Sequence, residues 1–353
     1  MEAEVVNVLK VFVPSLVAFF IGMALTPVLT HYLYKYKAWK KEGGKYALDG
    51  GVAHEFNKLH AEGEVKTPRM GGIIIWVSIL ITTLGIALLA EQFPYFFENL
   101  DFFSRSGTWI PLATLMVGSL VGLMDDLYDI LPKRSTLKLR YRLAIVVLLS
   151  LFIGWWFYEK LGVAEIGIPF ADPLFVGWLI IPLFILVSLA LYASGVIDGI
   201  DGLSGGVFIP IFASYGIIAF SQGQVDVAAF SATTVGALLA FLWFNIPPAR
   251  FYMTDTGTMG LTLTIAVLAF MTDSLGGGVG IAVLPIIGGI LVVTVLSNIL
   301  QVLSKKVRGK KLFKIAPLHH HFEAIGWPSY KVVMRFWVIG AVLAIIGTVI
   351  ALI

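Results

Sequence analysis

Long apolar segments separated by shorter polar ones form the dominant pattern along this chain. A membrane-spanning helix needs about 20 mostly apolar residues, and ten segments approach or exceed that length. They are Val11–Tyr34, Gly71–Ala90, Trp109–Met124, Leu143–Tyr158, Leu174–Ala193, Leu203–Ser221, Val227–Phe244, Thr258–Thr272, Val279–Leu303 and Val332–Ile353. The pattern predicts an all-α polytopic membrane protein with about ten transmembrane helices. Neither a linker nor a repeat of roughly 20–50 residues divides it, so residues 1–353 are expected to form a single integral membrane domain.

Composition and charge agree with this pattern and predict an orientation. The sequence is 58% hydrophobic and only 13% charged, which excludes an ordinary soluble domain. If the ten segments alternate across a membrane, one side receives 22 of the 25 Lys and Arg residues. Cytoplasmic loops are the basic ones, so this side is predicted to be cytoplasmic and both termini extracytoplasmic. Such loops favour anionic lipids and anionic soluble ligands. Cysteine is absent, which excludes disulfides and thiol chemistry.

Five carboxylates lie at the predicted cytoplasmic ends of apolar segments. A charge at the bilayer centre costs at least about 2.5–3.5 kcal/mol, so carboxylates near membrane depth require a reason. Asp125 and Asp126 directly follow the third segment, Asp198 and Asp201 lie in the loop DGIDG, and Asp255 precedes the eighth segment. Paired carboxylates raise one another's pKa unless a cation intervenes, and the glycines allow backbone N–H groups to approach a ligand. The alternatives are a solvated helix end for the pair and tight turns for the loops.

Three consecutive histidines form a second group, in a predicted basic loop between two apolar segments on the same side. His319, His320 and His321 stand in APLHHHFEAIGW, residues 316–327, directly after six Lys and Arg residues between positions 305 and 314. Imidazoles beside such cations suit an anionic ligand or a metal-bound phosphate; the alternative is a polar loop anchored by Trp327. The hard oxygens of the five carboxylates favour Mg²⁺, whose usual partner is a substrate phosphate. Together the two groups predict a cytoplasm-facing site for Mg²⁺ and phosphate.

The order of these motifs resembles that of the polyprenyl-phosphate N-acetylhexosamine-1-phosphate transferases, and within them the phospho-N-acetylmuramoyl-pentapeptide transferases of bacterial cell-wall synthesis. APLHHHFE is the most specific segment, because related transferases of simpler UDP-sugars carry a different histidine pattern. The resemblance runs nearly from end to end and rests on TPRMGG at 67–72, GLMDD at 122–126, DGIDGL at 198–203, FLWFN at 241–245, LQV at 300–302, APLHHHFEAIGW and RFW at 335–337.

This resemblance implies a fold, a location and a reaction. The expected protein has ten transmembrane helices, forms a homodimer in the bacterial cytoplasmic (inner) membrane, and has its active site on the cytoplasmic face. The implied reaction joins UDP-MurNAc-pentapeptide and undecaprenyl phosphate to give lipid I and UMP, with Mg²⁺. Membrane lipids are further expected partners, and nucleic acid is not one.

The resemblance also implies roles for individual residues. Catalytic positions are matched by Asp125, Asp126, Asp255 and His319, and Asp255 also matches the position that binds Mg²⁺. Phosphoryl transfer needs charge neutralisation and in-line positioning more than covalent assistance, which suits these residues. The residues expected to bind substrate are Lys66, Asp198, Asp201, Asn245, Tyr252, Gln301, His320 and His321.

Several positions depart from the family pattern. With the usual family residue in parentheses, they are Arg69 (Thr), Asp129 (Lys), Tyr192 (Asn), Gly195 (Asn) and Thr254 (Gly). Lys66 is the expected substitute for a lysine that normally precedes TPRMGG, and Lys133 or Lys138 is expected to supply the positive charge that is missing at position 129.

Three other functions remain open on the sequence alone. A sister-branch transferase of UDP-GlcNAc or a related sugar is favoured by TPRMGG but opposed by APLHHHFE. A secondary transporter would carry its carboxylates near the bilayer midplane, often within inverted repeats, and the sequence shows neither. A non-catalytic paralogue is suggested by the departures at positions 129, 192 and 195, and is opposed by the retained Asp125, Asp126 and Asp255.

Overall fold

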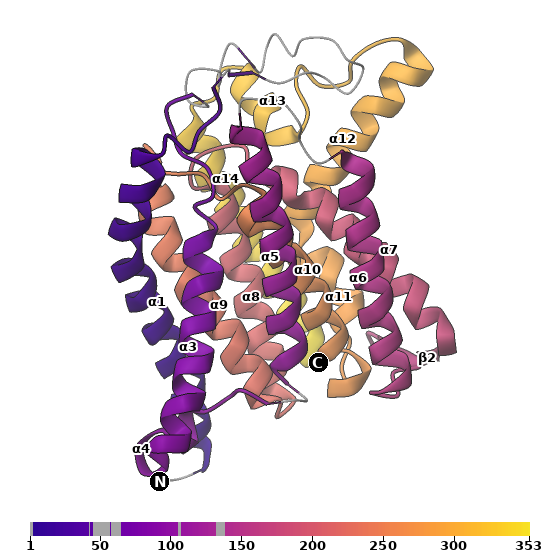
Figure 1. The fold of residues 1–353 in the computed structure, drawn as a ribbon. Helices are drawn as coiled ribbons and strands as arrows, with labels where there is room; N and C mark the ends of the chain where they lie inside the picture. The colour runs from indigo at the N-terminus through magenta and orange to yellow at the C-terminus, as the bar shows by residue number, and fades with distance from the viewer. Residues whose placement is uncertain (1–2, 42, 45–56, 58–64, 105–106, 132–137) are drawn as a thin grey trace.

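The computed structural model describes residues 3–41, 43–44, 57, 65–104, 107–131 and 138–353. In this part of the chain ten helical spans are long and apolar enough to cross a membrane, as the hydropathy pattern predicts, and they pack into one bundle (Figure 1). Nine are single helices: α1 (Ala3–Lys35), α3 (Ile73–Gln92), α5 (Trp109–Ile130), α6 (Leu139–Glu159), α8 (Leu203–Ser221), α9 (Val225–Asn245), α10 (Thr254–Met271), α12 (Gly289–Arg308) and α14 (Ser329–Leu352). The tenth is α7 (Ile180–Ala193), extended by the 3₁₀ turns η2 (Gly177–Leu179) and η3 (Ser194–Ile197).

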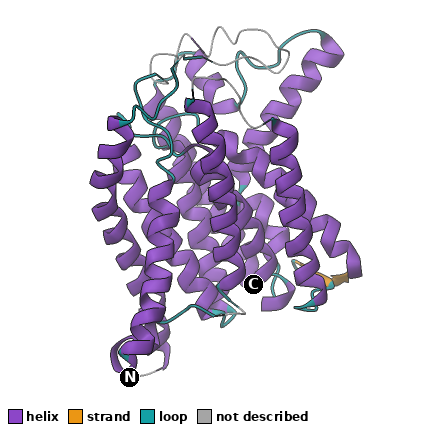
Figure 2. Cartoon of the chain, viewed as in Figure 1, coloured by secondary structure: helices purple, strands orange, loops and turns teal. Residues whose placement is uncertain are grey.

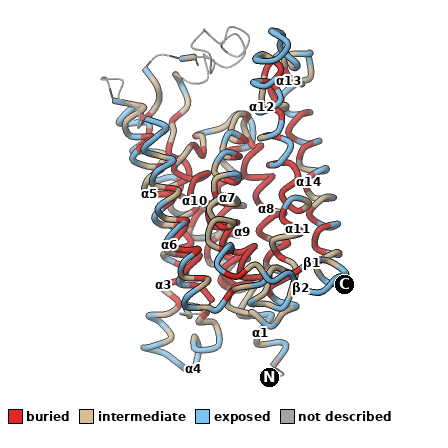
Figure 3. The backbone as a smooth tube through the Cα atoms, turned by 90° about the vertical axis from the view of Figure 1, so that its right-hand side faces the viewer, coloured by how far each residue is buried: buried red, intermediate tan, exposed pale blue. Residues whose placement is uncertain are grey.

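Helix α10 lies at the centre of the bundle. The structure buries 94% of its apolar window, against 22% for α1 and 28% for α6, which are peripheral. Its sequence is apolar or small on every side, as expected of a helix enclosed by others. Figure 3 shows buried inner faces and exposed outer faces along the peripheral helices. The exposed residues include large apolar side chains, such as Phe12 and Phe20 of α1, which suit contact with lipid.

Glycines bring α5 close to α10. A Cβ on Gly122 would overlap the backbone oxygen of Asp255, and one on Gly118 would lie 2.8 Å from the Cα of Gly260. Small residues spaced four apart let two membrane helices approach backbone to backbone. This close crossing brings the last turns of α5, with the Asp pair, against the first turn of α10.

The ninth predicted segment, Val279–Leu303, is not one helix. The chain forms α11 (Gly280–Ile287), is interrupted at Gly288, and continues as α12 to Arg308. Pro285 has no N–H to donate to the preceding turn and two glycines follow it, so the helix is weakest at this point. Helix α12 then runs on to the basic residues that the prediction had assigned to a loop.

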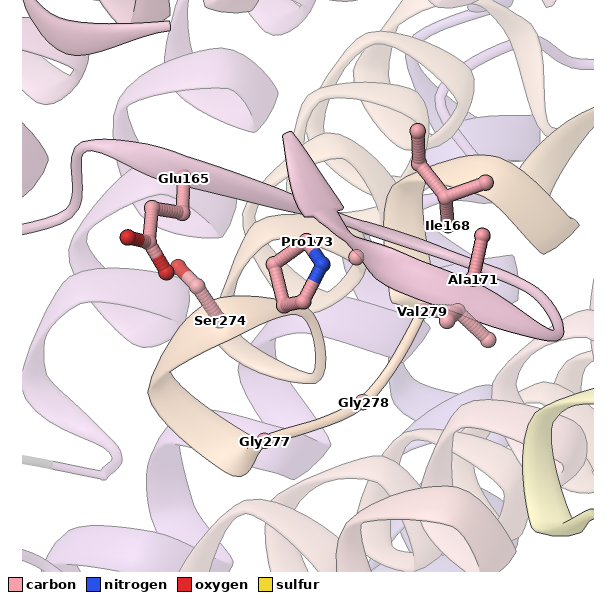
Figure 4. Close-up of a pocket in the computed structure, with 9 residues that line it drawn as sticks. Glu165, Ile168, Ala171, Pro173, Ser274, Gly277, Gly278 and Val279 are labelled. Atoms are coloured by element: carbon pink, nitrogen blue, oxygen red, sulfur yellow. The ribbon is translucent and has the colours of Figure 1, made fainter. Parts of the chain in front are cut away.

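Two elements were not predicted at all. A two-stranded antiparallel hairpin, β1 (Glu165–Ile168) and β2 (Ala171–Phe175), occupies the region where the fifth apolar segment was expected to begin. Figure 2 shows it as the sheet of an otherwise helical chain. It borders a shallow cavity of about 260 Å³ with the turn η4 (Ser274–Gly276), and Glu165 is the charged residue of its lining (Figure 4). The short elements α4 (Pro94–Phe97) and η1 (Glu98–Leu100) complete the connections.

The histidine run also forms a helix, not the predicted loop. It lies in α13 (Leu318–Ala324), which follows Pro317 at the helix N-cap. In Figure 1 α13 lies at one end of the bundle. Helix α1 begins, and helix α14 ends, near the opposite end. The hairpin and its cavity are also at that other end, because α10 starts at the α13 end and leads into η4.

Candidate active site

Asp126 is the most completely hydrogen-bonded carboxylate of the site. Its side chain is fully buried near the end of α5. Arg69 donates to its Oδ1 through Nη2 (2.9 Å) and Nε (3.3 Å). Thr254 Oγ1 (2.5 Å), Thr256 Oγ1 (2.5 Å) and the Thr256 backbone N–H (2.9 Å) all donate to Oδ2. Buried charges are stable when they are paired and fully hydrogen-bonded, so Asp126 is suited to joining α5, α10 and the Arg69 loop.

In its neighbour Asp125, one carboxylate oxygen accepts a hydrogen bond from the described residues and the other accepts none. Oδ2 accepts a hydrogen bond from Arg142 Nη1 at 2.6 Å, and the same nitrogen donates to Asp255 Oδ2 at 2.9 Å. Oδ1 of Asp125 is buried and has no hydrogen-bond partner among the described residues. The Asp255 side chain keeps 32% of its surface exposed. Asp125 and Asp255 therefore share one guanidinium. Asp255 keeps exposed surface for a ligand, and Oδ1 of Asp125 remains an unused hydrogen-bond acceptor.

The DGIDG loop lies next to this cluster. Asp198 accepts hydrogen bonds from Ser204 Oγ and from the Thr254 backbone N–H, both at 2.7 Å. Burial raises the pKa of Asp198 above its usual value, and those two hydrogen bonds lower it. Asp201 accepts from the backbone N–H of Ala249 at 2.9 Å. Both carboxylates thus bind the segment that leads into α10.

Asn245 and Tyr252 hold the same segment together. The buried Asn245 amide accepts from the Gly202 N–H (2.9 Å) and donates to the Phe251 carbonyl (2.8 Å). The Tyr252 carbonyl accepts from the N–H of Gly71 at 2.8 Å. The Asn245 amide therefore joins two loops of the site, and a role for either side chain in binding substrate remains a prediction.

Two histidines face the DGIDG loop. His319 and His320 are buried and their rings lie 4.4 Å apart. The Glu323 carboxylate accepts from His320 Nδ1 at 2.8 Å and from Ser329 Oγ at 2.6 Å. Because a carboxylate can only accept, Nδ1 carries the proton and Nε2 faces the loop. A Cβ on Gly199 would lie 2.6 Å from His320 Nε2, so this position leaves no room for a larger residue.

The third histidine and Gln301 hold the basic segment instead. His321 Nδ1 accepts from the Lys314 backbone N–H at 3.2 Å. Gln301 accepts from the backbone N–H groups of Leu312 (3.0 Å) and Phe313 (2.9 Å), and donates to the Phe313 carbonyl (2.9 Å). All three hydrogen bonds of the amide fix a segment that carries several lysines, so Gln301 can position positive charge near α13.

The structure therefore brings most of the predicted site residues to one end of the bundle. Asp125, Asp126 and Asp255 form one cluster, Asp198 connects it to the DGIDG loop, and that loop contacts His319 and His320. Lys66 is exposed in the turn that precedes Arg69, and it is Arg69 that forms the ion pairs with the carboxylates.

Comparison with known proteins identifies the family of this chain. A family model described as glycosyl transferase family 4 matches residues 108–273. The phospho-N-acetylmuramoyl-pentapeptide-transferase of Anoxybacillus flavithermus is 35% identical over 335 residues, which is 94% of both chains. The enzymes of the same name from Bacillus subtilis (35% over 338 residues) and a Geobacillus species (34% over 337) each cover 94% of this chain and 95% of their own length. This chain belongs to the phospho-N-acetylmuramoyl-pentapeptide-transferase family.

The positions at which this transferase departs from the family pattern lie in or beside the site. Thr254 has a left-handed backbone (φ 55°), a conformation that glycine adopts freely. Its hydroxyl bonds Asp126 and accepts from the Met70 N–H at 3.1 Å, which offsets the strain. Tyr192, in the last turn of α7, packs against a small buried apolar cluster that includes Met259 of α10. Gly195 packs against α10, since a Cβ there would lie 3.2 Å from Thr258 Oγ1.

Of the two lysines that we expected to supply positive charge near Asp129, the structure describes one. Lys133 lies outside the described residues, and Lys138 is exposed before α6. Arg69 forms an ion pair with Asp129, whereas Arg142 pairs with Asp125 and Asp255. Arg142 escaped prediction because the fourth apolar segment was expected to begin at Leu143, whereas α6 begins at Leu139 and includes it. An arginine inside an apolar span is a signal of function.

Glu323 was also missed. A carboxylate three residues after a histidine can contact it on a helix, but the segment was interpreted as a loop.

The donor set of the transferase fits Mg²⁺. No group of three or more His, Cys, Asp or Glu side chains forms a closed metal cage among the described residues. Mg²⁺ in phosphoryl transfer is commonly held by one or two carboxylates, with waters and substrate phosphates completing its shell. Asp255 is such a carboxylate, because 32% of its side chain is exposed, and Asp125 lies beside it on the shared guanidinium of Arg142.

Proposed function

We propose that this transferase moves phospho-MurNAc-pentapeptide from UDP-MurNAc-pentapeptide to undecaprenyl phosphate, giving lipid I and UMP in peptidoglycan synthesis. The observation that carries the proposal is the meeting of Asp125 and Asp255 at one end of a bundle that matches its relatives over 94% of its length. The site would lie on the cytoplasmic face of the bacterial inner membrane, with both termini outside, because the basic residues gather at its loops. The family resemblance also supports a homodimer.

Asp125 is the residue best placed to act on the lipid phosphate. Its free Oδ1 can accept the proton of a monoprotonated phosphate or orient the phosphate dianion. An oxygen of that phosphate then attacks the sugar-linked phosphorus of the UDP-sugar. The bond from this phosphorus to the bridging oxygen breaks, and UMP leaves with the electron pair. Direct attack suffices, because the lipid phosphate is already an anionic nucleophile.

The remaining groups bind and neutralise charge. Asp255, with Asp125 beside it, would hold Mg²⁺, which when bound would neutralise the diphosphate and make UMP a better leaving group. Arg142 contacts both carboxylates and can turn a donor towards a phosphate when it releases one of them. His319, His320 and the basic segment after α12 would bind the diphosphate or the sugar–peptide part. Asp126 keeps α5 and α10 in register.

UMP release by the purified full-length protein in detergent tests the proposal. The assay uses undecaprenyl phosphate and Mg²⁺ with UDP-MurNAc-pentapeptide, or with UDP-GlcNAc, and a chelator control. We expect chelator-sensitive release with the pentapeptide substrate alone, and none from Asp255→Ala. The matched control is Asp226→Asn, which removes a carboxylate paired with Lys10 at the other end of the bundle and should remain active. Release with UDP-GlcNAc alone would assign the protein to the sister branch, and full activity of Asp255→Ala would refute the metal assignment.

A further inference from the structure

Two cations at the start of α14 share one aromatic ring. The Trp327 indole lies in the turn between α13 and α14, and Lys331 and Arg335 of α14 place their charged groups over it. Arg335 Cζ is 4.3 Å from the ring centroid, and Lys331 Nζ is 5.1 Å from it. Phe322 of α13 stacks on the same indole, with the ring centroids 4.8 Å apart. The cation–π contacts hold both charges on one small surface.

Among the described residues, no carboxylate neutralises these two cations. The acidic residue of the same segment, Glu323, accepts hydrogen bonds from His320 Nδ1 and Ser329 Oγ instead. Lys331 and Arg335 are both exposed. Cations that a ring orients, but that no carboxylate pairs with, keep their donors available to an anion, and a guanidinium can present two donors to one phosphate.

The helix face that carries the two cations is the one that the bundle leaves uncovered. Lys331 and Arg335 are four residues apart, so they are neighbours on the surface of the helix. Val338 and Val342 continue this row and keep 64% and 50% of their surface exposed, whereas Val333, on the opposite side, is buried. Figure 3 shows α14 at the edge of the bundle. The exposed apolar row suits lipid chains, so the cations lie where the lipid-facing surface reaches the polar membrane interface.

We propose that Trp327, Lys331 and Arg335 bind the phosphate headgroup of an anionic membrane phospholipid, whose acyl chains lie along Val338 and Val342. The two cations neutralise the phosphate, and the indole lies at the interfacial depth that tryptophan prefers. A membrane lipid fits better than a soluble anion, because the cations continue directly into an apolar face. The site is separate from the carboxylates of the proposed reaction, and the inference goes beyond that reaction.

An occupied headgroup site would also stabilise the helix that carries the histidines. Phe322, which stacks on Trp327, lies in α13 directly after the histidine run. Its ring centroid is 6.3 Å from that of Phe336 in α14. A phospholipid bound to both Trp327 and α14 therefore holds together the corner from which His320 faces the DGIDG loop.

Quenching of tryptophan fluorescence by brominated lipids tests the site in the full-length protein. The protein is placed in phosphatidylcholine nanodiscs that contain a rising fraction of brominated phosphatidylglycerol or, for comparison, brominated phosphatidylcholine. Subtracting the signal of Trp327→Phe, made in each background, isolates the fluorescence of Trp327. Each cation near an anionic lipid contributes roughly a fivefold preference, so Trp327 should select phosphatidylglycerol by at least about fivefold in wild type and by less than about twofold in Lys331→Gln with Arg335→Gln. Each single exchange should give an intermediate preference, which keeps the test available if the double variant does not fold.

The matched control removes two other lysines from the same end of the bundle. Lys35→Gln with Lys37→Gln changes the net charge equally, leaves the Trp327 ring untouched and should keep the preference. An equal loss in this control would indicate a response to overall charge, and an unchanged preference in the double variant would place the site elsewhere. Either result overturns the proposal.

Two further outcomes would assign this face to another occupant and also overturn the proposal. If neither brominated lipid quenched Trp327, a second copy of the chain would be the better candidate for covering α14. If a much smaller amount of undecaprenyl phosphate displaced the phosphatidylglycerol, the site would belong to the lipid substrate. The assay contains no UDP-sugar, so its result does not depend on whether the proposed reaction is correct.

Discussion

The two adjacent aspartates should respond to the same substitution in opposite ways. Asp126→Asn turns Oδ2, which receives three hydrogen bonds from Thr254 and Thr256, into a donor that faces three donors. At about 1 kcal/mol for each net hydrogen bond, this loses about 3 kcal/mol. Removing one partner of a buried ion pair gives a similar figure, about 3–5 kcal/mol, because the Arg69 charge stays behind. The hydrogen-bond count and the ion-pair argument therefore both predict that Asp126→Asn is strongly destabilised.

Asp125→Asn should instead leave the fold nearly intact and remove activity. Arg142 keeps its ion pair with Asp255, and Oδ1 of Asp125 has no hydrogen bond to lose among the described residues. The stability loss should stay near 1 kcal/mol, the value of one net hydrogen bond. A neutral amide cannot accept a proton from the lipid phosphate, so kcat should fall by about 10²–10⁴-fold, the usual contribution of a general base.

Thermal unfolding in detergent, followed by the fluorescence of the nine tryptophans, measures the first effect, and UMP release measures the second. Activity is compared at a temperature at which both variants are folded. The reasoning is refuted if Asp125→Asn is destabilised as much as Asp126→Asn, or if Asp126→Asn unfolds like wild type. Either result would mean that the hydrogen bonds of the site do not give Asp126 a structural role and Asp125 a chemical one.

Three further substitutions test other parts of the structure. Gly199→Ala should lower kcat by up to about 100-fold, because its Cβ displaces the His320 ring; Gly85→Ala, with no neighbour within 4 Å, is the control. Glu323→Gln removes the charge that favours a protonated His320 ring. If the protonated ring binds the diphosphate, the alkaline limb of the pH profile of kcat/KM should move to lower pH, and an unmoved limb would exclude that role. At the opposite end, burial raises the pKa of Asp273 from 3.8 to about 6. The folded protein therefore binds this proton more tightly than the unfolded chain, so stability from Asp273 is present at low pH and is lost as the pH rises from about 4 through 6. The unfolding midpoint of wild type minus that of Asp273→Asn should fall over this range, and a constant difference would contradict the shift.

The hydropathy pattern predicted the spans well because each membrane helix satisfies its own backbone hydrogen bonds, so its existence depends on local composition. It failed where other forces decide. The polar positions of β1 and β2 carry no membrane signal, and the break at Gly288 depends on Pro285 and two glycines within an apolar run. The hydropathy pattern also misplaced the ends of some spans. Arg142 lies inside α6 but was predicted to precede that span, and Asp255 lies in the first turn of α10 but was predicted to precede that helix.

For the site, the sequence by itself determined which residue types were available and, through their order, the family. It could not rank Asp125 against Asp126, because the difference lies in hydrogen bonds from Arg69, Thr254 and Thr256, which are distant along the chain. It likewise offered nearby lysines to balance Asp129 but not the ion pair that the structure shows, which Asp129 forms with a residue 60 positions earlier. Hydropathy is a property of short segments, but charge compensation is a property of distance in space. The close crossing of α5 and α10 sets those distances, so the tertiary structure alone decided which carboxylate is bound and which is free.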